Sequence, residues 1–416
     1  MKRKNSVFIG MSSGFGPLAQ IMPIADELKK YDYESFCFIL RFAGEMIKTM
    51  DLRFLELPEI PTAKTINPKS PYWWNQDYFW TKYGYMDYEY VKALVENYTN
   101  ALLDIKPKVV ISSLHPVSAI VARRLKIPLV CVTQSCTHPN GKGGRTTWWK
   151  EMPQDLDSST PVVNRVLQEI GMEPIERMEE LNVGDLTIVP SIPEFDVIED
   201  KDAFYTGPMF WQGPDRLTKD QYKIERKNKY LVHIYTGHLL TSVGKAAGLI
   251  LLENAVKAFN NTEFDVIITT GTGQKVPEYI KPSDNVKIID WLPLNDVIPK
   301  CDIDIHHGGH GSSLQCLGHG VPSIVIPTMD EREYNARQLH ELGVSLYITP
   351  EELTPGLLLE KARTIVRTPE FKNNAKALAE NIRHKNFGGA PEAAKQIVGL
   401  VSAFDKEESN AGKTFG

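Results

Sequence analysis

The segment HHGGHGSSLQCLGHGVP, residues 306–322, gathers four histidines and five glycines within seventeen residues. It follows CDIDI, residues 301–305, whose alternation of apolar and polar residues predicts a strand. Glycine lets the backbone approach a ligand closely, and the first N–H groups of a helix have no intrahelical acceptor. A strand that passes through such a loop into a helix, which we expect to begin near Ser312, therefore predicts a site for phosphate or diphosphate.

The same segment permits two other interpretations. His306, His307 and His310 are candidate metal ligands, but neighbouring strand residues point to opposite faces, which disfavours a metal site. A purely structural turn is the second alternative. We favour phosphate binding, with His307 donating a hydrogen bond to a phosphate oxygen and the hydroxyls of Ser312 and Ser313 assisting.

Apolar runs of strand length recur along the chain with helical periodicity between them. This alternation predicts an α/β fold with parallel sheets, and it stops once, near residues 204–229, where two Gly-Pro pairs precede a charged stretch. We therefore expect an N-terminal domain (1–214), a linker (215–228), a C-terminal domain (229–385) and a C-terminal helix and tail (386–416). The sequence leaves open whether this tail crosses back to the N-terminal domain. The predicted strands lie at 6–10, 34–40, 108–113, 127–133, 186–191, 230–235, 265–271, 286–291, 303–309 and 321–327, with helices at 17–31, 115–125 and 247–259.

The charge, the cysteine content and the N-terminal sequence exclude several classes of protein. The chain has 416 residues and a net charge of −5, which gives no basic field for nucleic acid or an anionic membrane. Its five cysteines form no C-x-x-C pair, which favours a reducing compartment over disulfides or zinc. The apolar run at the N-terminus is too short for a secretory signal, and we expect a cytoplasmic protein, monomeric or homodimeric, without stable membrane insertion.

Residues 291–344, from WLPLNDV to HELGV, carry a denser pattern. It resembles the donor signature of the GT-B glycosyltransferases, in particular the UDP-glycosyltransferase and macrolide or antibiotic glycosyltransferase family. That signature runs W-x-P, H-G-G-x-G-T/S-x-x-E, G-V-P and P-x-x-x-D-Q-x-x-N-A. The resemblance implies two Rossmann-like, doubly wound domains that bind a nucleotide-diphosphate sugar and an acceptor, without a metal or another cofactor.

The resemblance also implies roles for individual residues. Trp291 would border the base, and Gln315 stands where the family has a glutamate that binds ribose. Glu331 and Arg332 replace the family's sugar-reading Asp-Gln pair. Arg332 is the larger departure from the family's pattern, and three interpretations are open. It would favour an anionic or unusually substituted sugar, it would reach the diphosphate, or it is a surface arginine on a helix. The diphosphate would be held by His307, Gly308, Gly309, Gly311 and Ser312, and Asn335 would bond locally.

Two further loops are expected to line the donor site. Gly237 and His238 follow the strand at 230–235, and residues 270–273, beginning with Thr270 and Gly271, follow the strand at 265–271. In the family such loops contribute backbone N–H and hydroxyl contacts to phosphate and base. His238 is equally well explained as an exposed side chain.

The first glycine loop, SSGFGPLAQ (12–20), lacks the histidine or aspartate that serves as general base in the family. His115, at the end of the strand at 108–113, is a substitute base, because imidazole titrates near neutral pH. Its alternative is a helix-capping histidine. Ser13 is a weaker candidate that would orient the acceptor, and His138 is weaker still. Two other interpretations also explain the missing base. The acceptor needs little deprotonation, or the chain no longer catalyses transfer.

Residues 72–90, YWWNQDYFWTKYGYMDYEY, are rich in aromatic side chains. They predict an aromatic pocket for a flat, hydrophobic acceptor such as a natural product, to which residues 146–150 would add. A helix buried against the sheet and a membrane-interface helix are the alternatives. The acceptor candidates are Trp73, Trp74, Phe79, Trp80 and Tyr83.

The sequence thus predicts a hexosyltransferase that moves a sugar from a UDP- or dTDP-sugar to a hydroxyl or amine of a small hydrophobic acceptor, with inversion. A non-catalytic GT-B-like partner or activator is the alternative. A nucleotide-sugar epimerase is a weaker third interpretation.

Overall fold

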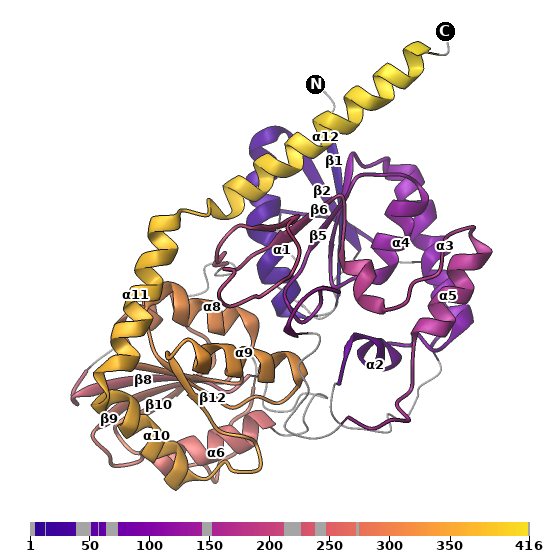
Figure 1. Cartoon of the computed structure of the whole chain (residues 1–416). Coiled ribbons are helices and arrows are strands. Elements are labelled where there is room, and N and C mark those ends of the chain that lie inside the picture. Colours follow the sequence, from indigo (N-terminus) through magenta and orange to yellow (C-terminus); the bar gives the residue numbers. More distant parts are fainter. Residues whose placement is uncertain are drawn as a thin grey trace. The chain divides into compact units, whose positions relative to one another are not determined.

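The computed structural model describes residues 5–12, 14–38, 51–56, 58–63, 74–143, 152–211, 226–237, 247–271 and 274–414. The chain divides into two compact units (Figure 1). The first contains Met1–Pro214 and Phe387–Gly416, and the second contains Asp215–Asn386. Most of the expected linker lies outside the described residues. Within the described part of the chain, no helix is long and apolar enough to cross a bilayer.

The first unit is built on a seven-stranded sheet in the order β3-β2-β1-β4-β5-β6-β7, with every pairing parallel. Its strands are β1 (Asn5–Met11), β2 (Tyr33–Phe38), β3 (Arg53–Leu55), β4 (Val109–Ser113), β5 (Leu129–Val132), β6 (Leu186–Val189) and β7 (Ala203–Tyr205). Its helices are α1 (Phe15–Leu28), α2 (Gln76–Thr81), α3 (Tyr88–Ile105), α4 (Pro116–Arg124), α5 (Thr160–Glu169) and α12 (Gly389–Thr414).

Alternate residues of the buried strands supply two hydrophobic layers in this unit. Val7 and Ile9 of β1 face a cluster that includes α1 and α12, whereas Phe8 faces a cluster with α3, α4 and α5. The C-terminal helix α12, yellow in Figure 1, thus packs beside α1 on the first unit's sheet. Strands buried on both faces explain the near-continuous apolar runs from which they were predicted.

The second unit has a six-stranded parallel sheet in the order β10-β9-β8-β11-β12-β13. Its strands are β8 (Tyr230–Tyr235), β9 (Phe264–Thr269), β10 (Val286–Ile289), β11 (Ile303–His306), β12 (Ser323–Val325) and β13 (Ser345–Tyr347). Its helices are α6 (Ala247–Phe259), α7 (Leu294–Val297), α8 (His310–His319), α9 (Asp330–Glu341), α10 (Pro355–Arg367) and α11 (Pro369–Lys385).

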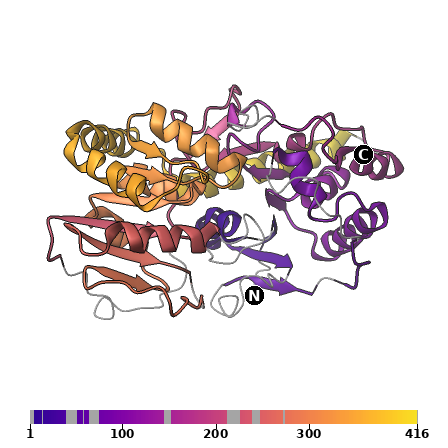
Figure 2. The same cartoon turned by 90° about the horizontal axis from the view of Figure 1, so that it is seen from below.

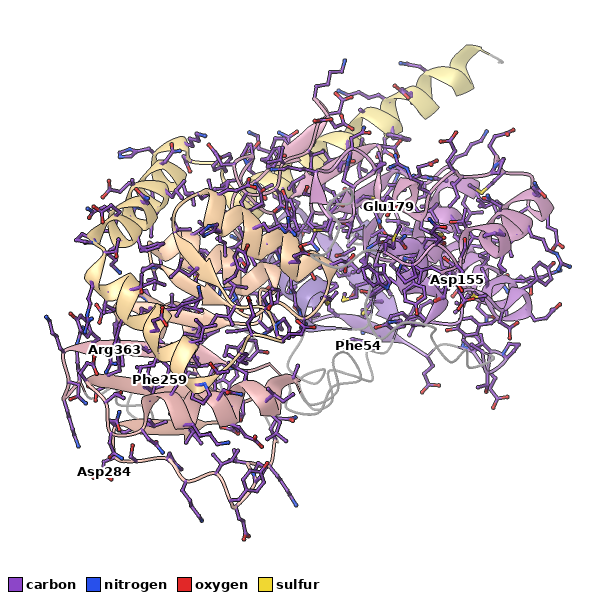
Figure 3. The ribbon with its side chains drawn as sticks, turned by 60° about the horizontal axis from the view of Figure 1, so that its bottom comes forward. Phe54, Asp155, Glu179, Phe259, Asp284 and Arg363 are labelled. Atoms are coloured by element: carbon purple, nitrogen blue, oxygen red, sulfur yellow. The ribbon has the colours of Figure 1, made fainter. Side chains whose placement is uncertain are left out.

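Helices also cover this sheet (Figure 2). Val232 and Ile234 of β8 pack in the cluster with α6 and α10, and Leu231 packs in the cluster with α7. The neighbouring helices α6 and α10 carry Phe259 and Arg363, which Figure 3 labels. The two parallel α/β sheets predicted from the sequence are confirmed, and residues 39–40 of the expected second strand lie outside the described residues.

Candidate functional site

Four strands of the second unit end side by side at the carboxyl edge of its sheet. In the register of the sheet, His306 of β11 pairs with Tyr235 of β8 and with Val325 of β12, and Tyr235 pairs with Thr269 of β9. The loops after these strands therefore leave from one edge. Ligands of open α/β sheets bind at this edge, where the chain continues into the next helix.

The imidazole of His307 lies between two glycines at this edge. A Cβ added to Gly309 would stand 3.0 Å from its Nε2, and one added to Gly237 would stand 3.3 Å from its Nδ1. Gly237 also has a φ of 70°, which disfavours other residues. The Tyr235 ring lies 5.2 Å from the His307 ring, centroid to centroid. The side chain predicted to contact phosphate is thus held by its neighbours at the end of the sheet.

Helix α8 begins at His310 with Gly309 as its N-cap, so the expected start near Ser312 was wrong. Glycine has no side chain to cap a helix, and the first ladder bond runs from Ser313 N to Gly309 O over 3.0 Å. The amides of Gly311 and Ser312 precede that ladder. They have no intrahelical acceptor and suit an anion.

Gly308 is the residue that shapes the loop. Its φ is 84°, and a Cβ there would lie 2.9 Å from both Arg332 O and Val325 Cγ1. Its amide donates to His306 Nδ1 over 3.0 Å, and its carbonyl accepts from Asn335 Nδ2 over 2.8 Å. The Gly308 amide is therefore engaged within the protein, and Asn335 makes the local bond expected of it.

A buried polar network lies directly before this loop. His233 Nδ1 is 2.5 Å from Asp304 Oδ1, and His233 Nε2 is 3.0 Å from Thr269 Oγ1. Burial alone would raise the pKa of Asp304, but His233 holds it below the ordinary value. The sequence analysis missed this pair. Its signal is a charged or titratable residue inside an otherwise apolar strand, in YLVHIY and in IDI.

Asp304, His306 and Cys316 bring three possible metal ligands within 4.8 Å of one another, and all three residues are buried. Because His306 Nδ1 accepts the Gly308 amide, a neutral ring carries its hydrogen on Nε2 and offers no lone pair there. The Cys316 thiol, whose pKa is raised by burial, donates to Asp304 Oδ2 over 3.3 Å. These contacts fit a hydrogen-bonded core better than a metal centre.

Other predicted donor residues lie around the same edge. Gln315 is one turn into α8, and its buried Oε1 has no hydrogen-bond partner among the residues that the structure describes. Thr270 is buried directly after β9, and Gly271 follows with a φ of 85°. Trp291, half-buried, follows β10 by two residues. A buried acceptor without a partner, as in Gln315, is a position where a ligand hydroxyl fits.

Helix α9 starts at Asp330 and places Glu331 and Arg332 in its first turn. Burial raises the pKa of Asp330 to about 7 and lowers the pKa of Arg332. Arg332 donates to Thr328 through Nη1, and its buried Nε has no hydrogen-bond partner among the described residues. The residue as a whole is partly buried, and its role in donor binding stays a prediction.

In the first unit, His115 is the N-cap of α4. Its Nδ1 accepts the Ser118 amide over 3.3 Å, and its Nε2 lies 3.2 Å from the Tyr98 hydroxyl. Burial lowers its pKa to about 4. The ring is neutral at pH 7 and both nitrogens are engaged, so it caps the helix as the alternative interpretation proposed. Its role as a base stays a prediction.

The aromatic segment packs largely into the core of the first unit. Trp74 and Trp80 are buried, and Phe79 and Tyr83 are partly buried against the same cluster. The Phe79 ring lies 4.9 Å from the rings of both Trp80 and Tyr83. This arrangement fits the alternative interpretation of the segment, a helix buried against the sheet. Acceptor binding by these residues stays a prediction.

Several predicted positions lie outside the described residues. They are Ser13 and Trp73, His238, residues 272–273 and residues 146–150.

Known proteins resemble this chain in sequence and in fold. Residues 253–397 match the family described as erythromycin biosynthesis protein CIII-like, C-terminal domain. Demethyllactenocin mycarosyltransferase of Streptomyces fradiae is 30% identical over 147 residues, which is 35% of this chain and 32% of that protein. NDP-glycosyltransferase YjiC of Bacillus subtilis (strain 168) is 26% identical over 233 residues, 55% of this chain and 57% of that protein. The matches span less than two thirds of these relatives.

The structure of glycosyltransferase VinC in complex with dTDP covers 96% of this chain and 100% of its own, with a TM-score of 0.69 and 19% identity. The chain therefore has the GT-B fold. The resemblance seen in residues 291–344 is confirmed: the chain is similar in sequence to natural-product glycosyltransferases, and residues 253–397 match the CIII-like C-terminal domain.

Proposed function

We propose that this protein is a glycosyltransferase that uses a nucleotide-diphosphate sugar, with UDP or dTDP as the nucleotide. The observation that carries the proposal is the start of α8, where the Gly311 and Ser312 amides precede the helical ladder close to His307. A helix N-terminus and a histidine donor suit a diphosphate, which becomes more negative as it leaves. The relatives named as glycosyltransferases support the same class.

In the proposed reaction, a hydroxyl oxygen or amine nitrogen of the acceptor attacks the anomeric carbon of the sugar. The bond from that carbon to the β-phosphate oxygen breaks, and its electron pair leaves with the nucleoside diphosphate. The acceptor's proton passes to a base or to water. Attack from the face opposite the leaving group inverts the anomeric configuration, and His307 with the α8 amides orients the donor.

The proposed acceptor is a small hydrophobic natural product. Support comes from the partly exposed aromatic rings of Phe79 and Tyr83, and from a relative named for demethyllactenocin. The five cysteines, all buried and none in a disulfide, support the proposed cytoplasmic location. The monomeric or dimeric state stays a prediction.

A thermal-shift panel of nucleotides and nucleotide sugars tests donor binding. A ligand present at about a hundred times its Kd stabilises the folded state by about 2.7 kcal/mol. We expect UDP, dTDP or their sugars to raise the melting temperature and the free nucleosides to leave it unchanged. Mass spectrometry then detects glycosylated products from a panel of polyketide and phenolic acceptors. A panel in which no nucleotide raises the melting temperature contradicts the proposal.

One observation favours the second candidate, a non-catalytic GT-B-like partner. The first glycine loop offers no base, and both ring nitrogens of His115 are engaged. Nucleotide-dependent stabilisation without transfer or donor hydrolysis would select this candidate over the enzyme.

A further inference from the structure

The guanidinium of Arg332 has unused capacity for an anion. Its Nη1 donates to Thr328 Oγ1, but its Nε is buried and has no hydrogen-bond partner in the part of the chain that the structure describes. Among the ion pairs of the described residues, none includes Arg332. The residue is partly buried, and a cation whose Nε is removed from water without a partner is unfavourable, so a negatively charged ligand would stabilise it.

Other arginines of the second unit are paired differently. Arg337, on the same helix, forms an ion pair with the buried carboxylate of Glu333. Arg363 on α10 binds Glu263 through Nε and Nη2 at 2.9 and 3.0 Å. Both arginines form ion pairs with protein carboxylates. Arg332 forms none among the described residues, although the nearby charges of Glu331 and Asp330 act on it.

The position of Arg332 indicates which anion it faces. A Cβ at Gly308 would lie 2.9 Å from the Arg332 carbonyl and 3.1 Å from its Cβ, so the arginine lies against the loop that leads into α8. Its charge also acts on Tyr235, where it opposes the burial that raises the pKa of the tyrosine. The ring of Tyr235 lies beside His307. Arg332 therefore shares one surface with the predicted phosphate-binding histidine.

We propose that Arg332 binds the diphosphate of the donor and stabilises the negative charge that it gains when the glycosidic bond breaks. This inference rests on the proposed function. The electron pair of the broken bond goes to the β-phosphate oxygen, and a fixed guanidinium offers that oxygen a charge-assisted hydrogen bond. Thr328 is a positioning residue, because its hydroxyl accepts a hydrogen bond from Nη1 of Arg332.

The test is calorimetric titration of UDP and dTDP, with UMP and dTMP as probes that lack the β-phosphate. R332Q keeps a polar side chain of similar length and removes the charge. We expect it to raise the Kd of the preferred diphosphate at least tenfold, to change that of the monophosphate less than twofold, and to lower kcat at least thirtyfold. R332K should recover part of the loss, and T328V should lose less than R332Q.

R363Q is the matched control, because Arg363 is an arginine of the same unit that binds the carboxylate of Glu263. It should leave both affinities unchanged. If R332Q does not fold, T328V and R332K carry the test, and unchanged diphosphate affinity in both overturns the inference. Unchanged diphosphate affinity in folded R332Q also overturns it, as does a loss confined to donors whose sugar bears a carboxylate. A wild-type protein that binds no nucleotide contradicts the proposed function itself.

Discussion

The amide of Gly308 donates a hydrogen bond to Nδ1 of His306 over 3.0 Å, immediately after β11. The last residue of the strand thereby holds the loop that follows it. The loop leads into α8, whose first amides, those of Gly311 and Ser312, we propose to bind an anion. His306 acts from inside the core, where its pKa is lowered by burial and its ring is neutral.

His306→Ala should therefore damage both stability and donor binding. The buried Gly308 amide would lose its acceptor, which costs about 1–3 kcal/mol, in addition to the cavity that the smaller side chain leaves. Urea unfolding measures the loss, and titration with UDP or dTDP measures affinity. His384→Ala, at an exposed site on α11, is the control. Wild-type affinity in a stable His306→Ala variant would show that the loop does not depend on this bond.

Gly308→Ala and Gly311→Ala form a matched pair that separates strain from ligand contact. Alanine at position 308 meets a positive φ and two atoms at 2.9 Å, so we expect a loss of about 2–4 kcal/mol. Among the described residues, beyond its chain neighbours and its own helix, no heavy atom lies within 4 Å of a Cβ at Gly311. Alanine there should leave stability unchanged or raise it by up to about 1 kcal/mol. Thermal melts of the two variants check this, and equal stabilities would contradict the described loop.

His307→Ala should lower turnover at least tenfold and leave stability nearly unchanged. The side chain is partly buried between two glycines and should contribute more to the diphosphate than to packing. Steady-state kinetics with the preferred donor provide the measurement. Turnover equal to that of the wild type would refute the phosphate role of His307.

Gln315→Leu should weaken UDP or dTDP binding five- to tenfold, because the buried Oε1 would lose its ligand partner. Binding of inorganic pyrophosphate should not change, since we propose that His307 and the α8 amides, and not Gln315, contact the diphosphate. Gln315→Glu keeps an acceptor and should bind the nucleotide nearly as the wild type does. Equal losses for pyrophosphate and nucleotide in Gln315→Leu would exclude a contact to the ribose.

The decrease in the free energy of unfolding at acid pH should reflect the protonation of His115. Its pKa falls from 6.5 to about 4 on folding, so the unfolded chain binds a proton between these values and the folded chain does not. The stabilisation is complete above pH 6.5 and is lost as the pH falls towards 4, by roughly 3 kcal/mol. Unfolding at several pH values should show a shallower decline in His115→Asn, which removes this titration.

The same variant tests the catalytic role, because asparagine is a good N-cap and should preserve α4. If His115 is the base, His115→Asn should impair transfer more than donor binding. Equal activity in the variant and the wild type would dismiss it as the base.

The parallel strands could be predicted from the sequence because apolar runs are local signals. The sheet edge at which we propose that the donor binds could be predicted in the same way, from a dense glycine motif. The start of α8 was misplaced by two residues, since Ser312 is a better cap by composition than Gly309. The engagement of the Gly308 amide was not foreseeable, because it depends on the ring orientation of His306. Trp80 and Phe79 show a further limit: one aromatic pattern serves both a core and a pocket, and only packing separates the two.

The most direct test is a crystal structure of the protein with UDP or dTDP, whichever gives the larger thermal shift. We expect the diphosphate oxygens within hydrogen-bonding distance of the Gly311 and Ser312 amides and of the His307 ring. A nucleotide bound elsewhere, or α8 amides bonded to protein acceptors in its presence, would contradict the account.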